Sequence, residues 1–333
     1  MEATYILPIR HSKVDEDLDE LTDYLSWLAR QVEVIVVDGS PPDVFAVHHA
    51  CWRTLGSHIA PDADIQVANG KVRGVLTGLR RASYEHVVIA DEDVCYDEPS
   101  LTQLVALLEE FDVIRPQNYF DPLPWHAYWD TGRTLLNRMT GGDWPGTLGM
   151  NASFLSATDG YDGNVLFENL ELVRTVRAAG GRELVALDLY VLRKPATDHH
   201  FWSQRVRQAY DEFARPVRLL VSLAILPLTL SLLLHRRWIA LASAVATIIG
   251  VAEMGRRRDG GQRAFPFTAS LLAPAWVMER AICIWLALGM RVFSGGVRYH
   301  GTILSRAAHS ERVLRRRFLE HSPRSQEIPL PSL

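Results

Sequence analysis

Residues 86–93 read HVVIADED, a run of apolar, mostly β-branched residues that ends in two carboxylates separated by one residue. The run has the length of one buried strand, and uninterrupted apolar strands are typical of parallel sheets. Open α/β sheets bind their ligands beyond the carboxyl ends of the strands. The position of Asp91 and Asp93 therefore predicts a binding site at that edge of a sheet.

The rest of the first 115 residues repeats the same pattern. Runs with the composition of strands alternate with runs of helical apolar spacing: strands at 4–9, 33–38 and 112–116, and helices at 17–31, 71–82 and 99–111. Alternation of this kind predicts a doubly wound, mostly parallel sheet. A further helix at 167–179 and a strand at 184–191 are expected beyond it.

Residues 116–165 differ from both patterns. They are crowded with Pro, Gly, Trp, Tyr and Asp and show little periodicity, so we expect a long ordered loop region that positions binding groups. Its aromatic residues are candidates for stacking on a sugar or lining an acceptor groove, with core packing as the alternative: Trp125, Trp129 and Trp144.

Three apolar stretches follow residue 215. The first two, 219–234 and 238–252, contain no charged residue and are slightly shorter than the ~20 residues of a spanning helix. Flanking arginines and Trp238 can extend them to the membrane surface. The third, 264–290, contains two prolines and the pair Glu279-Arg280. We predict a membrane hairpin followed by an interfacial or re-entrant helix, with a buried helical core as the alternative.

Charge is distributed unevenly along the chain. Residues 256–333 contain 13 Arg, no Lys and 5 acidic residues, whereas the whole chain has a net charge of −4. A basic end beside apolar runs favours an anionic membrane surface over nucleic acid, because the arginines do not alternate with aromatics on a separate domain. We predict a catalytic domain at 1–215, a transmembrane hairpin at 216–255, and a membrane-associated helix with a basic tail at 256–333.

The N-terminus shows no signal-peptide pattern, and the three cysteines have neither disulfide nor metal-ligand spacing. The sequence therefore predicts a multi-pass protein of the cell membrane whose catalytic domain faces the cytoplasm, a reducing compartment.

Candidate site residues also stand at the ends of the first two predicted strands: Pro8 and Arg10 at one, and Asp38 at the other. Two carboxylates in D-x-D spacing can share Mg²⁺ or Mn²⁺ with a nucleotide diphosphate, because these cations prefer oxygen ligands and keep phosphates in their coordination shell. D-x-D is a weak signal alone, and a solvated loop or helix cap is the alternative.

Taken in order, these motifs resemble glycosyltransferase family 2, which has the GT-A fold. The matching elements are Pro8, VVDGS at 36–40, Lys71 with Gly74 and Gly78, DED at 91–93, GYD at 160–162 and FENLEL at 167–172. The segment HFWSQRVR at 200–207 is similar to the Q-x-x-R-W element of membrane-bound members such as ceramide glucosyltransferases. The resemblance covers about residues 4–215.

This resemblance implies a GT-A catalytic domain with a Rossmann-like, mostly parallel sheet. It also implies an inverting hexosyltransferase that moves a sugar from a nucleotide-sugar to a hydroxyl of a lipid or lipid-linked acceptor. A divalent cation, Mg²⁺ or Mn²⁺, would be held by Asp91 and Asp93. The donor-binding residues carried over from the family are Pro8, Arg10, Asp38, Lys71, Asp91, Gln204 and Arg207.

One departure from the family concerns the general base. The family places an Asp where this chain has Asn169, and a neutral amide cannot accept the proton of an acceptor hydroxyl. Glu168 is the nearest replacement and Glu171 the next. A polysaccharide-forming transferase and a non-catalytic, membrane-bound nucleotide-binding scaffold remain alternatives.

Overall fold

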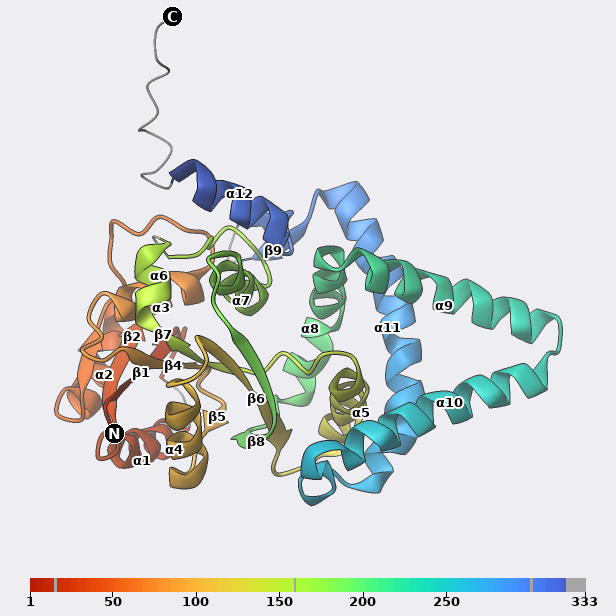
Figure 1. Ribbon diagram of the computed structural model, residues 1–333, viewed down its shortest axis with the longest axis horizontal. Coiled ribbons are helices and arrows are strands. Elements are labelled where there is room, and N and C mark those ends of the chain that lie inside the picture. Colours follow the sequence, from red (N-terminus) through yellow and green to blue (C-terminus); the bar gives the residue numbers. More distant parts are fainter. Residues whose placement is uncertain (15–16, 159, 300–301, 322–333) are drawn as a thin grey trace, which may run out of the picture.

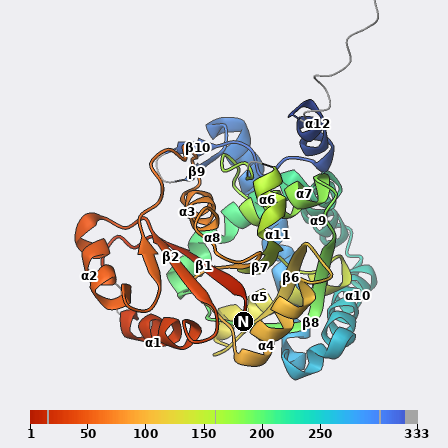
Figure 2. The same ribbon diagram turned by 60° about the vertical axis from the view of Figure 1, so that its left-hand side comes forward.

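The computed structural model describes residues 1–14, 17–158, 160–299 and 302–321 of the 333-residue chain. Its centre is an eight-stranded sheet flanked by helices on both faces (Figures 1 and 2). The strands lie in the order β3 (Ser57–Ile59), β2 (Glu33–Asp38), β1 (Ala3–Ile9), β4 (His86–Ala90), β7 (Thr147–Asn151), β6 (Val113–Phe120), β8 (Glu183–Arg193) and β5 (Val94–Cys95).

The sheet is mostly parallel, as the sequence predicts. Strands β3, β2, β1 and β4 run parallel, β7 is antiparallel to β4 and β6, and β6 is parallel to β8. Because side chains alternate along a strand, Tyr5 and Leu7 of β1 enter one core and Ile6 enters the other. The expected α/β fold of the catalytic domain is thereby confirmed.

Six helices cover the two faces. One core contains residues of α1 (Leu18–Leu28), α2 (Pro42–Trp52) and α4 (Glu98–Leu107). The other contains residues of α3 (Gly70–Leu79), α6 (Ala152–Ala157) and α7 (Glu168–Ala178). This division leaves the carboxyl ends of β1, β2 and β4 at one edge, where α3 begins.

The expectation of a long loop at 116–165 is wrong for much of that range. It contains helix α5 (Trp125–Met139), strand β7 and helix α6. The helical period of α5 is hidden in the sequence because its buried face is largely polar: His126, Asp130, Thr131, Thr134, Asn137 and Arg138. These groups bond to other residues of α5 and to neighbouring elements, so apolar spacing does not reveal the helix.

The C-terminal third is helical. Helix α8 (Asp198–Tyr210) and the short η1 (Asp211–Ala214) lead into α9 (Pro216–Leu234), α10 (Trp238–Arg257), η2 (Arg258–Arg263) and α11 (Phe267–Ser294). Three helical segments, at 216–234, 238–263 and 267–294, are long and apolar enough to cross a membrane. Their most apolar windows are 6%, 11% and 44% buried within the protein.

These helices are arranged in two ways. In Figure 1, α9 and α10 project together away from the sheet and meet at a turn, whereas α11 runs across their bases. Helix α11 packs against α5 and α8 of the catalytic domain as well as against α9 and α10. The hairpin is therefore exposed over most of its length, with α10 packed on α5 at its end, while α11 has one face against the α/β domain.

The chain then returns to the catalytic domain. The hairpin of β9 (Val297–Tyr299) and β10 (Thr302–Leu304) precedes α12 (Glu311–His321), which packs against α7. Part of the basic tail predicted at 256–333 thus contacts the catalytic domain. Residues 322–333 of that tail lie outside the described residues.

Close packing of α10 on α5 gives a stability prediction. A Cβ added at Gly255 would collide with the carbonyl oxygen of Leu135, whereas one at Gly250 would meet no atom within 4 Å. We expect Gly255→Ala to destabilise the solubilised protein by about 1–3 kcal/mol, the usual cost of overpacking. Gly250→Ala, in the same helix, should leave the melting temperature unchanged or raise it. Equal melting temperatures for the two variants would contradict this packing.

Candidate active site

Three groups from distant parts of the chain meet at the end of β4. Asp91 follows that strand, and its Oδ1 lies 2.5 Å from Nζ of Lys71, in the first turn of α3. The same Nζ lies 3.1 Å from Oε1 of Glu168, the first residue of α7. The Asn69 side chain accepts a hydrogen bond from the Lys71 amide and so caps α3. The sequence-predicted residues Asp91, Lys71 and Glu168 thus form one cluster.

A second cation, Arg193, joins the two carboxylates of the D-x-D motif. Its Nε lies 2.8 Å from Oδ2 of Asp93, and its Nη2 lies 3.5 Å from Oδ2 of Asp91. Sequence reasoning did not identify Arg193. The available signal was its place at the end of the predicted strand 184–191, the same kind of position that identified Asp91.

The electrostatics of this cluster leave Asp93 incompletely satisfied. Burial raises the pKa of Asp93, although Arg193 and Lys71 oppose that shift. Burial alone would lower the pKa of Lys71, but Asp91 and Glu168 outweigh it and raise the pKa. Oδ1 of Asp93 is buried and has no hydrogen-bond partner. An orphaned carboxylate oxygen beside a second carboxylate suits a hard divalent cation.

The loop before β7 closes one side of the cluster. The Asp91 amide donates to the Gly146 carbonyl at 2.8 Å, and a Cβ at Gly146 would lie 2.9 Å from Oδ2 of Asp91. A side chain at Gly146 would therefore crowd the carboxylate. Asn169 donates from Nδ2 to the Pro145 carbonyl at 3.0 Å. Asn169 thus holds this loop against α7.

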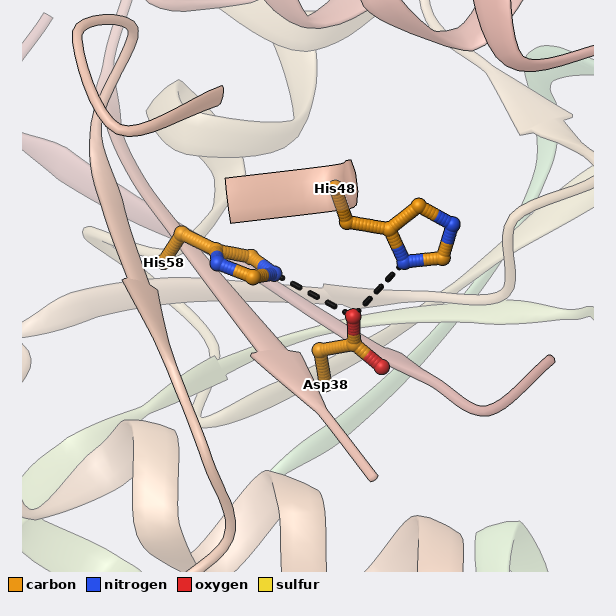
Figure 3. Close-up of side chains that lie close together, drawn as sticks. All are labelled: Asp38, His48 and His58. Atoms are coloured by element: carbon orange, nitrogen blue, oxygen red, sulfur yellow. Dashed lines mark hydrogen bonds and ion pairs between the residues drawn. The ribbon is translucent and has the colours of Figure 1, made fainter. Parts of the chain in front are cut away.

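Asp38 lies beside the cluster at the end of β2, but its carboxylate is enclosed. His48 Nδ1 lies 2.7 Å and His58 Nε2 3.2 Å from Oδ2, and the Ser40 amide donates to Oδ1 (Figure 3). Burial would raise the pKa of Asp38, but the bonds to His58, Ser40 and His48 outweigh it and lower the pKa well below its usual range. A nucleotide-sugar can hydrogen-bond to this carboxylate only by displacing one of these partners.

The other residues expected near the donor occupy the same edge. The Cα and Cβ of Pro8 face Gly74 of α3, which has no room for a side chain. Arg10 is exposed after β1. Next to it, His11 lies 2.5 Å from the half-exposed Glu92. The edge formed by β1, β2 and β4 is therefore lined with polar groups.

Glu171 is not part of this cluster. It is fully buried, and its carboxylate accepts hydrogen bonds from the His309 amide at 2.7 Å and from His309 Nδ1 at 2.8 Å. Asp162 adjoins the pair, with Oδ2 3.7 Å from His309 Nδ1. The geometry therefore favours Glu168 over Glu171 as the carboxylate available for chemistry.

Helix α8 supplies Gln204 and Arg207. Gln204 lines a hollow together with Asp93 and Arg193, and its Oε1 accepts a hydrogen bond from Arg207 at 3.1 Å. Arg207 in turn lies near Asp211, whose pKa burial raises to about 7 although Arg207 and Arg215 oppose the shift. Gln204 thus lines the same hollow as Asp93. Arg207 does not line that hollow, but it donates a hydrogen bond to Gln204.

The three tryptophans do not form one surface. Trp125 is 49% exposed and its ring lies 6.0 Å from that of Trp202, while Trp129 donates from Nε1 to Glu279 of α11. Trp144 lies beneath the guanidinium of Arg115, at 4.0 Å from the ring centroid. Only Trp144, which also contacts the Phe167 ring, lies next to Glu168.

A buried ion-pair network lies next to the site, and the sequence analysis did not predict it. Arg205 of α8 is 2% exposed and forms two bonds to Glu279 of α11, at 2.6 and 2.9 Å. It forms a third, at 2.9 Å, to Asp130 of α5. The signal was Glu279 itself, a charge inside an otherwise apolar stretch.

One protein-family model matches part of the first half of the chain. Residues 15–168 match the model of the family described as "Glycosyl transferase family 2". None of the curated proteins matches the chain.

Solved structures with a similar chain path share less than 20% identity with it. They include a mannosyltransferase from Pyrobaculum calidifontis in complex with GDP-Man and Mn²⁺, at 18% identity and TM-score 0.49, with 85% of this chain and 87% of that chain covered. S. aureus TarS 1-349 is similar at 14% identity and TM-score 0.45, with 91% and 96% covered. Glucosyl-3-phosphoglycerate synthase from Mycobacterium tuberculosis is similar at 16% identity and TM-score 0.40, with 60% and 73% covered.

The orphaned oxygen of Asp93 gives a binding prediction. We expect Asp93→Asn to weaken Mn²⁺-dependent binding of a nucleoside diphosphate by at least about tenfold, because an amide is a poorer cation ligand than a carboxylate. Calorimetry on the solubilised protein with UDP, GDP and dTDP measures this. Glu92→Gln is the matched control, since it removes the same charge from the half-exposed residue between the two aspartates. An unchanged Mn²⁺ response in Asp93→Asn would remove Asp93 from the site.

Proposed function

We propose that this chain, whose residues 15–168 match the model of glycosyltransferase family 2, transfers a sugar from a nucleotide-sugar to a lipid or lipid-linked acceptor at a membrane. The observation that supports this most directly is the cluster of Lys71, Asp91 and Glu168 at the end of β4, joined through Arg193 to Asp93. It combines two carboxylates in D-x-D spacing, two basic groups and a third carboxylate, Glu168, which is paired with Lys71, at the edge where α/β sheets bind ligands.

Asp91 and Asp93 are the residues that would hold Mg²⁺ or Mn²⁺, and the cation would offset the negative charge that develops on the departing nucleoside diphosphate. Two protein ligands leave the remaining coordination positions to water and phosphate oxygens, which Mg²⁺ retains in such sites. Lys71 and Arg193 neutralise the carboxylates in the structure. Both are placed to turn toward the donor diphosphate when a cation takes over that role.

Glu168 is the proposed general base. Its carboxylate lies at the start of α7 and contacts only one cation, Lys71, among the described residues. In a single displacement, Glu168 takes the proton of the acceptor hydroxyl while the hydroxyl oxygen attacks the anomeric carbon. The bond to the nucleoside diphosphate breaks on the opposite side, so the anomeric configuration inverts. Asn169, at the position of the family's base, holds the loop of Pro145 instead.

The segment 200–207 supports the finer proposal that the enzyme is similar to membrane-bound members such as ceramide glucosyltransferases. Gln204 lines the same hollow as Asp93 and Arg193, so part of that motif faces the site. Trp125 and Trp202, both about half exposed, lie side by side on α5 and α8. Trp rings at a polar–apolar boundary are typical of membrane interfaces, which suits a lipid acceptor.

The return of the chain to the catalytic domain bears on membrane topology. Leu166 and Phe167 donate backbone hydrogen bonds to the carbonyls of Arg306 and Ala307. The residues before α9 and those after α11 therefore lie on the same side of any membrane, which requires an even number of crossings. We propose that α9 and α10 cross and that α11 does not.

Helix α11 has the character of an interfacial helix. Residues Ala269, Ala273 and Arg280 are buried on the face toward the catalytic domain, whereas Leu271 and Leu286 are about half exposed on the other. One face against protein and one apolar face outward suits a helix that lies along the membrane surface. With the catalytic domain in the cytoplasm, Arg256–Arg258 also lie inside, as the positive-inside rule favours.

A base is needed only for the chemical step, and this gives the test of the proposed function. Donors are first identified by thermal stabilisation with UDP-, GDP- and dTDP-sugars, with and without Mn²⁺. We then expect Glu168→Gln to lower the transfer rate by at least about 100-fold and to leave donor binding nearly unchanged.

Asn169→Asp is the matched control, because it restores the family's residue and should be harmless or increase transfer. A fully active Glu168→Gln together with an inactive Glu171→Gln would move the base by one helical turn. If no nucleotide-sugar stabilises the protein, the proposed function is wrong.

The proposed topology predicts that both ends of the chain lie in the cytoplasm. A fluorescent reporter fused after residue 333 should be bright, and a phosphatase fusion there should be inactive. A phosphatase fusion in the turn at 235–237 should be active. The two arginines of that turn, Arg236 and Arg237, work against this orientation. An active phosphatase at residue 333 would mean three crossings.

A further inference from the structure

An open hollow of about 130 Å³ lies between α11 and the residues of α5, β8 and η1, and its lining includes Arg193, which contacts Asp93. We call it the arginine pocket, and its basic lining residues come from five elements: Arg133 of α5, Arg193 of β8, Arg215 before α9, Arg218 of α9 and Arg280 of α11. Trp144, Trp276 and Phe167 add aromatic walls. The pocket thus joins the catalytic cluster to the helices of the membrane region.

Arg280 is the most unusual of these groups. It is 5% exposed, yet its Nε and Nη1 have no hydrogen-bond partner, and no described carboxylate forms an ion pair with it. Its neighbour Glu279 is taken by Arg205. The guanidinium lies 5.2 Å from the ring of Trp276, whose buried Nε1 also has no partner. A buried cation with free donors is costly unless an anion pairs with it.

The neighbouring arginines do not have enough carboxylates either. Arg215 and Arg218 share Glu212, at 3.4 and 3.2 Å, and Nε of Arg215 is buried without a partner. Burial raises the pKa of Asp211, the other acidic residue of the pocket, to about 7. Arg133 and Arg193 are paired with aspartates outside the lining, whereas Arg215, Arg218 and Arg280 have only Glu212 and Asp211 beside them in the pocket. The pocket therefore has more positive charge than its own carboxylates balance.

We propose that the arginine pocket binds the phosphate group of the acceptor lipid. Guanidinium groups match phosphate oxygens in geometry and remain charged when buried. The inference rests on the proposed function and narrows its acceptor to a lipid whose headgroup contains phosphate beside the reacting hydroxyl.

The position of the pocket favours binding of the acceptor lipid over binding of the nucleotide-sugar donor. The donor diphosphate belongs at Asp91 and Asp93, which contact Arg193 but do not line the pocket. Phe167, which lines the pocket, is adjacent in the chain to Glu168. A phosphate held by Arg280 and Arg218 would thus place a headgroup hydroxyl toward the proposed base. Since these arginines belong to α11 and α9, the lipid chains would leave along the membrane helices.

The test uses the full-length protein in neutral detergent and measures binding by thermal stabilisation with dodecyl phosphate, dodecanol and inorganic phosphate. Wild type should be stabilised by dodecyl phosphate and not by dodecanol. Arg280→Gln should weaken the apparent affinity for dodecyl phosphate about 10- to 100-fold, the effect of losing charged hydrogen bonds. Without ligand, the same variant should melt at or above the wild-type temperature, because it removes an unpaired buried charge.

Arg218→Gln, at the partly exposed rim, provides a second variant in case Arg280→Gln does not fold, and it should also weaken dodecyl phosphate binding. Arg257→Gln is the matched control, since Arg257 is exposed on α10 outside the pocket. Equal losses in Arg257→Gln and the pocket variants would mean non-specific attraction and would overturn the proposal. Inorganic phosphate binding as tightly as dodecyl phosphate would also overturn it, in favour of a soluble ligand.

A fourth measurement separates this proposal from the proposed function. Mn²⁺-dependent stabilisation by the donor nucleotide should persist in Arg280→Gln. If that stabilisation is lost while dodecyl phosphate binding is kept, the pocket belongs to the donor and the acceptor assignment fails. If wild type shows no nucleotide response at all, the proposed function fails, whatever the lipid result.

Discussion

The buried contacts of Arg205 with Asp130 and Glu279 hold the two halves of this molecule together. They join α8, α5 and α11, so the helix that packs at the bases of α9 and α10 is fixed to the α/β domain by charge as well as by packing. Removing one partner of such a network typically costs about 3–5 kcal/mol, because it leaves an uncompensated buried charge. The hollow beside Asp93 and the arginine pocket both have Arg205 or its neighbours in their walls.

Charge balance also explains which groups contact one another in the site. Asp91, Asp93 and Glu168 are held by two cations, Lys71 and Arg193, and neither cation is exclusive to one carboxylate. Shared partners of this kind can be exchanged when a cation and a phosphate enter together. The arginine pocket shows the opposite imbalance, with more guanidinium groups than carboxylates. The two sites meet at Arg193, so negative and positive excess lie next to each other.

The sequence predicted the helices and strands that follow an apolar pattern. It predicted few of the features that depend on buried polar contacts. Strands β1, β2 and β4 are uninterrupted apolar runs, and that pattern alone places the residues at their ends along one edge of the sheet. Helix α5 was missed because its inner face is polar. The sequence ranked Glu168 before Glu171 by position alone, and it could not predict that Glu171 pairs with His309, a partner 138 residues away. Arg280 was noticed only as a charge that argued against a membrane crossing.

The pairing of Glu171 with His309 also sets an order of events during synthesis. Chains grow at roughly 5–20 residues per second, so His309 follows Glu171 by on the order of ten seconds. The apolar helices α9, α10 and α11 are made in that interval. Until His309 arrives, the buried position of Glu171 would hold an unpaired carboxylate, and α7, which begins with the proposed base, lacks its contact with the C-terminal segment. The support of α7 is therefore completed only after these three helices have been made.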